Sequence, residues 1–298
     1  MNERSKGNRI LFVGLNTVDI QLVVPDYPEP NTKTKASRCI IYPGGPATNA
    51  AVTCAHVGEK VDLFTPVGKH AFTDFILEDI RKFGIHIIDP VSYDYSDPVF
   101  ASIVSSENNG DCTVFLYHPQ IQYNIYDDIN FELNINKLVM FDGYYPEFAL
   151  PLVKRCKERN ICTVLDGGSW KSCLAELLYY VDVALCSNDF QPPGVKENGE
   201  IIKYMQNKGV KLCAITRGNE SILYAEGKVK SEIDTSPVNS VDTLGAGDVF
   251  HGAFCYYYSN GFNFTESLKK ASYIAGESCK SLGTRQWTDN FMIDNASV

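Results

Sequence analysis

Short hydrophobic runs alternate with longer segments of helical periodicity along most of the chain. Each short run has four or five residues, which is the length of a buried strand. These runs are Ile10–Val13, Val61–Thr65, Leu138–Phe141, Cys162–Leu165, Val183–Cys186 and Leu212–Ile215. The segments with helical periodicity are Ala47–Val57, Ala71–Phe83, Pro146–Arg159, Lys171–Tyr180, Gly199–Lys208, Gly245–Ser259 and Thr265–Lys280. Strands and helices that alternate in this way predict an α/β fold, in which helices cover both faces of a largely parallel sheet.

Two stretches, Gln21–Ile41 and Val99–Tyr117, depart from this order because apolar and polar residues alternate in them. Such alternation is typical of half-exposed antiparallel strands. The turn-forming residues Asn108–Asp111 lie inside the second stretch and predict a hairpin there. We therefore expect a small β-sheet that projects from the main body. The chain has no internal repeat and no obvious linker, which favours one domain over residues 1–298.

Composition narrows the class of protein and its surroundings. Of the 298 residues, 44% are hydrophobic and 21% are charged, which is ample for a globular core. The net charge of -9 argues against a nucleic-acid binder, which needs a basic face. Ten cysteines without a CxxC pair, mostly in apolar surroundings, indicate thiols in a reducing compartment. The apolar run Ile10–Leu15 is too short for a signal sequence or a membrane span, so the cytoplasm is the expected location and no membrane contact is expected.

The segment Val241–Phe250 carries the strongest chemical signal. Gly245, Ala246 and Gly247 are small enough to let a ligand approach the backbone at the start of a predicted helix, where unpaired N–H groups favour an anion. Asp248 in the first turn could accept the proton of a hydroxyl placed over that site while the amides stabilise a transferring phosphoryl group. A tight turn followed by an acid that stabilises the helix dipole is the alternative explanation of the same residues.

The string Asp242–Asp248 matches the DTxGAGD signature, and on it the chain resembles the ribokinase-like (PfkB) carbohydrate kinases. The resemblance covers nearly the whole chain. Near its start, Gly44 and Gly45 precede a helix that carries Asn49, and this string resembles the family's first glycine signature. In relatives these positions line the sugar site, and Asp19 matches an acid that holds sugar hydroxyls. The resemblance thus implies substrate binding by Asp19, Gly44, Gly45 and Asn49, and catalysis by Asp248 with Gly245, Ala246 and Gly247.

The resemblance also implies a nucleotide site. Thr216 and Gly218 resemble the family's TxG element, and Asn188 stands where relatives carry an Asn near the nucleotide phosphates. With Gly245 and Gly247 these residues would bind ATP. Gln191 replaces the Glu that relatives link to the water shell of the metal. Mg²⁺ would accompany ATP, held through water and phosphates rather than by a protein cage. A monovalent cation beside the anion hole is a further possibility that relatives offer.

The implied fold is a three-layer α/β sandwich whose central sheet is mostly parallel, with a small β-sheet lid formed by the two alternating stretches. In relatives the lid is often a dimer surface, so a homodimer through the lid is one arrangement that the resemblance suggests.

The sequence departs from the family where the sugar would lie. Cys112 occupies the lid hairpin position at which ketohexose kinases often carry a basic residue, and Pro46 follows Gly45 where their motif has Asn. Pro46 together with the string Asp248–Gly252 is more similar to the branch that includes sulfofructose kinases, within a wider group of ketohexokinases and fructokinases. The expected acceptor is a ketohexose or a related sugar.

The expected lining residues carry no positive charge, so we expect a free sugar or an acid-bearing sugar rather than a sugar phosphate. Lys33, Lys35 and Arg38 in the first lid stretch are the only cations that the sequence offers nearby. If this stretch is a strand, Lys33 and Lys35 share one face and Arg38 points to the other. Solvated charge on the lid is the alternative explanation of all three.

Other functions stay open at this point. The chain has no GxxxxGK[ST] P-loop, no GxGxxG after a strand and no HExxH helix, which removes three competing nucleotide or metal sites. A nucleoside or pentose kinase of the same family is the main alternative, followed by a non-catalytic regulatory protein that kept the kinase fold. The intact Gly-Ala-Gly-Asp run favours an enzyme. Asp166 and His251 could line the site, or could be a turn acid and a core histidine.

Overall fold

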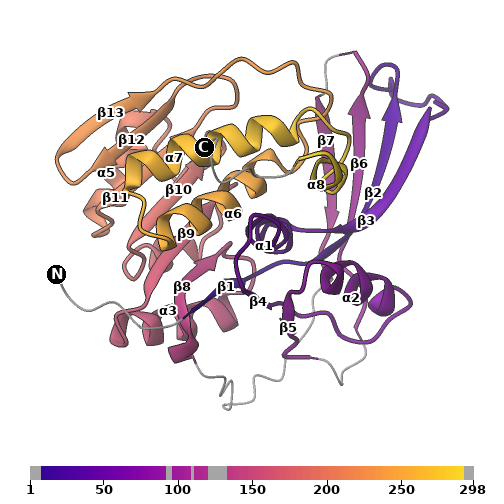
Figure 1. Cartoon of the computed structure of the whole chain (residues 1–298). Helices are drawn as coiled ribbons and strands as arrows, with labels where there is room; N and C mark the ends of the chain where they lie inside the picture. The colour runs from indigo at the N-terminus through magenta and orange to yellow at the C-terminus, as the bar shows by residue number, and fades with distance from the viewer. Residues whose placement is uncertain (1–7, 92–95, 109–110, 120–132, 292–298) are drawn as a thin grey trace.

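A nine-stranded sheet forms the centre of the molecule (Figure 1). The computed structural model describes residues 8–91, 96–108, 111–119 and 133–291. In spatial order the strands are β13 (Val229–Ile233), β12 (Ile222–Glu226), β11 (Leu212–Thr216), β10 (Val183–Ser187), β9 (Cys162–Gly167), β8 (Asn136–Phe141), β1 (Arg9–Val13), β4 (Val61–Phe64) and β5 (His86–Ile88). All neighbours pair in parallel except at β12, which is antiparallel to both β11 and β13. The predicted, largely parallel sheet is confirmed.

Successive residues of each central strand enter two separate hydrophobic cores. Ile10 and Phe12 pack on one face, whereas Leu11 and Val13 pack on the other. Side chains alternate along a strand, so a strand that is covered on both faces appears in the sequence as a continuous apolar run. The central strands have this pattern. The first core is completed by α1 (Pro46–His56), α2 (Thr73–Lys82), α6 (Ala246–Ser259), α7 (Phe264–Ser278) and α8 (Gln286–Asn290). The second is completed by α3 (Pro146–Glu158), α4 (Leu174–Leu177) and α5 (Asn198–Asn207).

A second sheet of four strands projects beside the main body (Figure 1). Its order is β3 (Arg38–Gly44), β2 (Thr17–Val24), β6 (Phe100–Ser106) and β7 (Cys112–Tyr117). β6 and β7 pair antiparallel as the predicted hairpin requires, although Asn109 and Gly110 of its turn lie outside the described residues. This is the expected lid sheet. The lid sheet begins at Thr17, four positions before the predicted boundary. Residues 25–37, between β2 and β3, form no strand or helix.

One predicted helix is corrected by the structure, and several short elements were not predicted. The helix expected at Lys171–Tyr180 is reduced to α4, because Tyr179 and Tyr180 donate backbone hydrogen bonds to the carbonyls three residues earlier and so form turns. Strands β12 and β13 were not expected at all, and β13 is exposed along most of its length, so no apolar run marks it. The short strand β5 and the short helix α8 were also missed. None of the helices in the described part of the chain has the length and hydrophobicity needed to cross a lipid bilayer.

The helices that carry the signature motifs cross in close contact. α6 packs against both α1 and α7. At the crossing of α1 and α6, a Cβ on Gly252 would lie 2.2 Å from the carbonyl oxygen of Ala50 and 2.8 Å from Cβ of Thr53. Glycine at this position therefore lets the two backbones approach, which fixes the first turn of α6 relative to the first turn of α1.

We expect Gly252→Ala to destabilise the protein by about 1–3 kcal/mol, the usual cost of overpacking a core, measured by urea denaturation. The matched control is Gly199→Ala in the first turn of α5, where a Cβ would have no atom within 4 Å. The control should be neutral or slightly stabilising, because alanine lowers the entropy of the unfolded chain. Equal stability of the two variants would contradict the close approach of α1 and α6.

Candidate active site

The first turn of α6 is shaped by glycine. Gly245 stands before the helix with a left-handed backbone at φ 73°. A Cβ there would lie 2.5 Å from Cγ2 of Thr284, so both backbone and space require glycine. A Cβ on Gly247 would meet nothing within 4 Å, and the residue is exposed. The amides of this turn are thus open to a ligand, and the N-terminus of a 14-residue helix favours a negatively charged one.

The half-buried carboxylate of Asp248 lies in this turn and is bound by Asn49 of α1. Nδ2 of Asn49 donates to Oδ2 of Asp248 at 2.7 Å. Burial raises the pKa of Asp248 to about 7, and the negative charge of Asp166 adds to this effect, whereas the Asn49 hydrogen bond and the nearby His251 lower it. A carboxyl group with a pKa near 7 can both take up and release a proton at neutral pH, which suits a general base.

Arg285, which no sequence motif indicated, fixes the orientation of Asn49. Nη1 of Arg285 donates to Oδ1 of Asn49 at 2.8 Å, which leaves the amide nitrogen of Asn49 facing Asp248. The guanidinium also donates to the backbone carbonyl of Pro43 at 2.8 Å and to Oδ2 of Asp79 at 3.0 Å. Arg285 therefore ties α1, α2 and the end of β3 together behind the Asn49–Asp248 pair.

Asp19 lies on the lid strand β2 and faces the end of β3. The hydroxyl of Thr17 donates to Oδ1 of Asp19, and burial raises the pKa of this carboxyl to about 6. A Cβ on Gly44 would lie 1.9 Å from Oδ2 of Asp19, so only glycine leaves room for the carboxylate. Gly45, at φ 95°, is equally constrained because a Cβ would lie 2.5 Å from the carbonyl oxygen of Leu15. Asp19, Gly44 and Gly45 are thus brought together as predicted.

Asp166 and His251 are both buried beside Asp248. Nε2 of His251 lies 3.6 Å from Oδ1 of Asp166. Nδ1 and Nε2 of His251 are 2.6 Å and 3.1 Å from the carbonyl oxygens of Gly247 and Leu185. Both ring nitrogens of His251 therefore lie within hydrogen-bond distance of backbone carbonyl oxygens, which fixes the orientation of the imidazole. The pair joins α6 to the carboxyl ends of β9 and β10, and Oδ2 of Asp166 has no hydrogen-bond partner among the described residues.

The expected nucleotide residues lie at the same edge of the sheet on other strands. Ser187 at the end of β10 is paired with Thr216 at the end of β11, so Asn188 and Gly218 follow neighbouring strand ends. Asn188 and Gly218 are exposed, and Thr216 is half-buried, with its hydroxyl 3.4 Å from the carbonyl oxygen of Cys186. Ligands of α/β sheets bind at the carboxyl ends of the strands. These three residues do not contact Asp248 and form a separate group beside it.

A third group of residues, which the sequence did not single out, surrounds the end of β8. Oδ2 of Asp142 accepts from the backbone N–H of Leu15 at 2.7 Å and of Ala47 at 3.3 Å, and Oδ1 accepts from Tyr144 at 3.0 Å. Burial raises the pKa of Asp142 to about 6. Lys171 lies alongside, with its ammonium 3.3 Å from the carbonyl oxygen of Asp142 and 4.1 Å from the ring centre of Tyr144.

Lys33, Lys35 and Arg38 are all exposed, which favours the alternative of solvated charge on the lid. Lys33 and Lys35 lie in the exposed segment between β2 and β3, which is not a strand, so strand alternation does not apply to them. Arg285, which binds Asn49, and Lys171, which lies beside Asp142, are cations that come from distant parts of the sequence. The two tryptophans pack: Trp287 is buried against His56, and Trp170 lies edge-on to Phe190.

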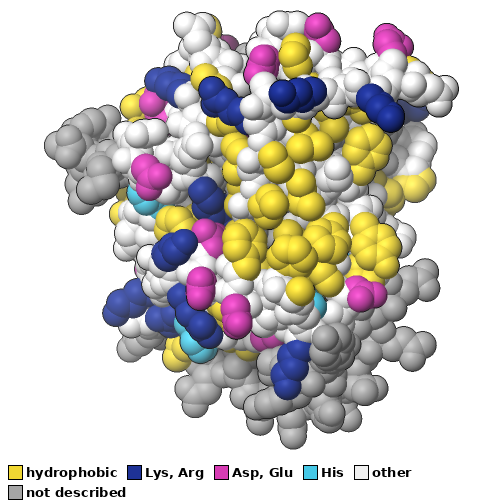
Figure 2. All heavy atoms as spheres, turned by 90° about the vertical axis from the view of Figure 1, so that its right-hand side faces the viewer, with side chains coloured by type: hydrophobic (Ala, Val, Ile, Leu, Met, Phe, Trp, Pro, Cys, Tyr) yellow, Lys and Arg dark blue, Asp and Glu magenta, His cyan; other side chains and the backbone are white. Residues whose placement is uncertain are grey.

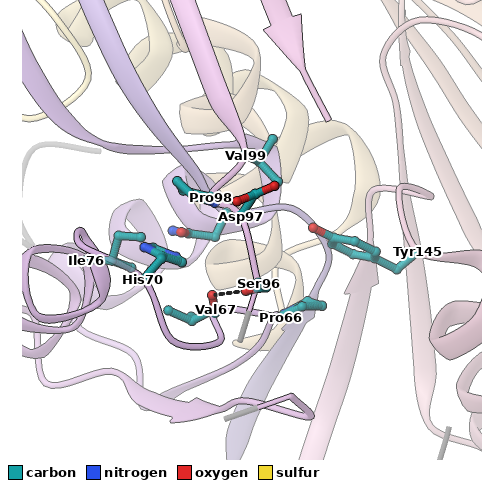
Figure 3. Close-up of a pocket in the computed structure, with 10 residues that line it drawn as sticks. Pro66, Val67, His70, Ile76, Ser96, Asp97, Pro98, Val99 and Tyr145 are labelled. Atoms are coloured by element: carbon teal, nitrogen blue, oxygen red, sulfur yellow. Dashed lines mark hydrogen bonds between the residues drawn. The ribbon is translucent and has the colours of Figure 1, made fainter. Parts of the chain in front are cut away.

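A small cavity lies next to the end of β1 (Figure 3). Its polar lining residues are Asn16, His70, Ser96 and Asp97, and Tyr145 stands at its side. The backbone N–H of Phe72 donates to Nδ1 of His70 at 3.1 Å, and burial lowers the pKa of His70, so this imidazole is neutral. The cavity adds neutral and acidic groups, but no cation, to the Asn16 side of the site.

The lid sheet is joined to the loop before α6, which contains Asp242, by a buried hydrogen-bond network. Nε2 of Gln21 on β2 donates to Oδ2 of Asp242 at 2.7 Å, and the hydroxyl of Tyr42 on β3 donates to Oε1 of Gln21 at 2.7 Å. Asp242 also accepts from the backbone N–H of Gly283 at 2.8 Å and of Leu244 at 3.0 Å. The loop before α6 and the lid are therefore held in one arrangement.

Comparisons with known proteins agree with this fold. The model of the pfkB family carbohydrate kinases matches residues 8–290. Ketohexokinase of Mus musculus is 23% identical over 288 residues, which cover 91% of this chain and 96% of that protein. A nucleoside kinase of Methanocaldococcus jannaschii is 26% identical over 265 residues, covering 87% and 86%. The crystal structure of ribokinase from Thermotoga maritima has a TM-score of 0.76 at 24% identity, and the match covers 94% of this chain and 98% of that one.

The fold, with its large, mostly parallel sheet and smaller lid sheet, is thus ribokinase-like. The chain belongs to the pfkB family of carbohydrate kinases and is a phosphotransferase. Membership of this family implies ATP as the phosphoryl donor. The alternative of a non-catalytic protein on the same fold is set aside.

We expect Arg285→Met to destabilise the protein by roughly 1–3 kcal/mol, because it leaves Asp79, the Pro43 carbonyl and Asn49 without their donor. Urea denaturation measures the loss. Lys154→Met is the control, since it removes an exposed ion pair with Glu176 that should contribute little to stability because solvent screens it. If Arg285→Met unfolds no more easily than the control, Arg285 does not hold Asn49 in place.

Proposed function

We propose that this protein transfers the γ-phosphoryl group of ATP to a hydroxyl of a small sugar, with Asp248 as the general base. The observation that carries the proposal is the position of Asp248, beside open helix amides and within 2.7 Å of an oriented Asn49. An acceptor hydroxyl over the first turn of α6 would have a proton acceptor on one side and an anion site on the other. General-base catalysis and oriented amide dipoles are the two contributions that phosphoryl transfer needs from a protein.

In the proposed reaction the acceptor oxygen attacks the γ-phosphorus as its proton passes to a carboxylate oxygen of Asp248. A new P–O bond forms, and the bond from the γ-phosphorus to the bridging oxygen of ADP breaks. The amides that follow Gly245 stabilise the negative charge of the transferring group. Asn49 holds the carboxylate of Asp248 in place, and Arg285 holds Asn49.

Asn188, Thr216 and Gly218 with Gly245 and Gly247 are the proposed ATP-binding residues. They lie at the carboxyl ends of β10 and β11 and at the start of α6, where a triphosphate could extend along the edge of the sheet. No group of three or more His, Cys, Asp or Glu that could hold a metal occurs in the described part of the chain. Family membership implies that Mg²⁺ accompanies ATP, and it would be bound through the triphosphate and water and would neutralise phosphate charge there.

Asp19, Gly44, Gly45 and Asn49 are the proposed sugar-binding residues. The buried carboxyl of Asp19 can accept hydrogen bonds from vicinal hydroxyls, and Gly44 leaves room for this carboxylate at the end of β3. We propose a ketohexose or a related sugar as the acceptor, and the similarity to a ketohexokinase supports this. A pentose or a nucleoside is the second candidate, supported by the similarity to a nucleoside kinase.

We also propose a homodimer through the lid and a cytoplasmic location. Figure 2 shows hydrophobic side chains gathered over the lid side of the molecule, with lysine and arginine at the rim. The exposed large side chains on the lid strands are Ile41, Val114, Phe115, Leu116 and Tyr117. An apolar face of this kind on an edge strand is normally covered by a partner. All ten cysteines are free thiols, which supports a reducing compartment.

We expect Asp248→Asn to lower turnover by about 10²–10⁴-fold, the usual contribution of a positioned base, with the fold intact because Asn49 can still donate to the amide oxygen. Since Asp248 must be deprotonated, wild-type turnover should fall as the pH drops below about 7. ADP release with ketohexoses, pentoses and nucleosides over pH 5–9 measures both effects. Near-native turnover of the variant, or a flat profile between pH 5 and 7, would exclude Asp248 as the base.

For the dimer, we expect the double substitution Val114→Lys/Leu116→Lys to halve the molar mass measured by light scattering after gel filtration. The two side chains lie on the same face of β7, so the lysines place like charges opposite each other in the proposed interface. The control is Val229→Lys on β13, which is 65% exposed and far from the lid. A wild type that elutes as a monomer at all concentrations would rule out the dimer.

A further inference from the structure

Lys171 provides a positive charge at the end of β9 that the proposed mechanism does not use. Its ammonium is 3.3 Å from the carbonyl oxygen of Asp142 and 3.4 Å from that of Ser169, and it lies 4.1 Å from the ring centre of Tyr144. No carboxylate of the described residues forms an ion pair with it, unlike Arg285, which is paired with Asp79. An ammonium has three N–H donors, so one remains after the two carbonyls are served.

The order of strands places this ammonium on the acceptor side of Asp248. The expected nucleotide residues follow β10 and β11, whereas Asn16, Gly45 and the cavity of Figure 3 adjoin the end of β1. β8 lies between β9 and β1, and Lys171 reaches back from the end of β9 to the carbonyl at the end of β8. The side chain therefore points away from the ATP-binding strands and towards those that surround the sugar.

The surroundings of Lys171 are strongly acidic. Burial raises the pKa of Tyr144 to about 12, and the carboxyl groups of Asp142, Asp166 and Asp248 add to this effect, so all three lie within electrostatic reach of its hydroxyl. An acceptor that carried a negative charge would be repelled by these carboxylates unless a cation met it. Lys171 is half-buried and held by two carbonyls and an aromatic ring, so little side-chain entropy would be lost when an anion binds.

We propose that Lys171 determines specificity by binding an anionic substituent of the acceptor, a carboxylate or a sulfonate, at the end remote from the phosphorylated hydroxyl. This inference rests on the proposed sugar kinase activity and names the substrate class within it. A single ammonium balances a single negative charge. A phosphate, with about two negative charges at neutral pH, would meet one cation and three carboxyl groups.

The test compares acceptors of equal chain length that differ in charge: fructose, fructuronate, 6-deoxy-6-sulfofructose and fructose 6-phosphate. The wild type should have its highest kcat/KM with a singly charged acceptor. In Lys171→Met the ratio of kcat/KM for that acceptor to kcat/KM for fructose should fall by about 10–100-fold, which is the range of one charge-assisted hydrogen bond. Lys171→Arg should restore part of the ratio, because the charge returns with a different reach.

The matched control is Lys208→Met. Lys208 is also half-buried with its ammonium over a tyrosine ring, 4.3 Å from the centre of Tyr179. It follows α5 and precedes the amino end of β11, so it lies at the opposite edge of the sheet from the site. The ratio should not change in this variant. An unchanged ratio in Lys171→Met would overturn the inference, as would a wild type that prefers fructose or fructose 6-phosphate.

Calorimetric titration of each acceptor without nucleotide separates this inference from the proposed reaction. If the protein phosphorylates none of the acceptors but binds a singly charged one, and Lys171→Met weakens that binding by about 10-fold or more, the proposed reaction fails and the Lys171 site stands. If fructose is phosphorylated but no charged acceptor binds better than fructose, the reaction stands and the Lys171 site fails.

Discussion

The hydrogen bond between Asn49 and Asp248 joins the first turns of α1 and α6, although the two residues are 199 positions apart in the sequence. The rest of the site depends on this contact, because it holds the carboxylate of the second glycine motif, Asp248, next to the side-chain amide of the first, Asn49. Two features make the contact possible: Gly252 lets the helix backbones approach, and Arg285 turns the amide of Asn49 towards the carboxylate. The lid is tied to the same assembly, since Arg285 binds the Pro43 carbonyl and Gln21 binds Asp242.

Several carboxyl groups are buried at this edge of the sheet, and their pKa values are raised as a result. The pKa values of Asp19 and Asp142 are raised to about 6 and that of Asp248 to about 7, in each case chiefly by burial. These carboxyl groups have different partners and therefore different uses. Asp142 accepts three backbone N–H groups and serves to hold the ends of β1 and β8 and the start of α1 together. Asp248 accepts only one side-chain donor among the described residues and keeps capacity for a ligand.

Much of this arrangement could be predicted from the sequence, and the failures have physical causes. The six central strands were predictable because both of their faces are buried, which makes them continuous apolar runs. β13 could not be recognised because it is exposed at an edge, where composition is unconstrained. The residues around Gly45 and Gly245 were predictable because tight turns and open amides demand glycine. The roles of Arg285 and Lys171 could not be predicted, because an isolated basic residue has no recognisable sequence pattern. Its contacts form only when distant segments meet in the fold.

The crowding of acidic groups around Asp248 also bears on the end of the catalytic cycle. In the proposed reaction a phosphorylated product would carry more negative charge than the acceptor that entered, and its phosphate would lie near Asp248, whose pKa is raised by burial and by the charge of Asp166. Repulsion at these short distances is strong where water is scarce. If Asp248 is the base, the buried carboxyl groups around it would favour dissociation of the product, so that affinity falls once transfer is complete. The proposed site would thereby have a direction, from capture of a hydroxyl to expulsion of a phosphate ester.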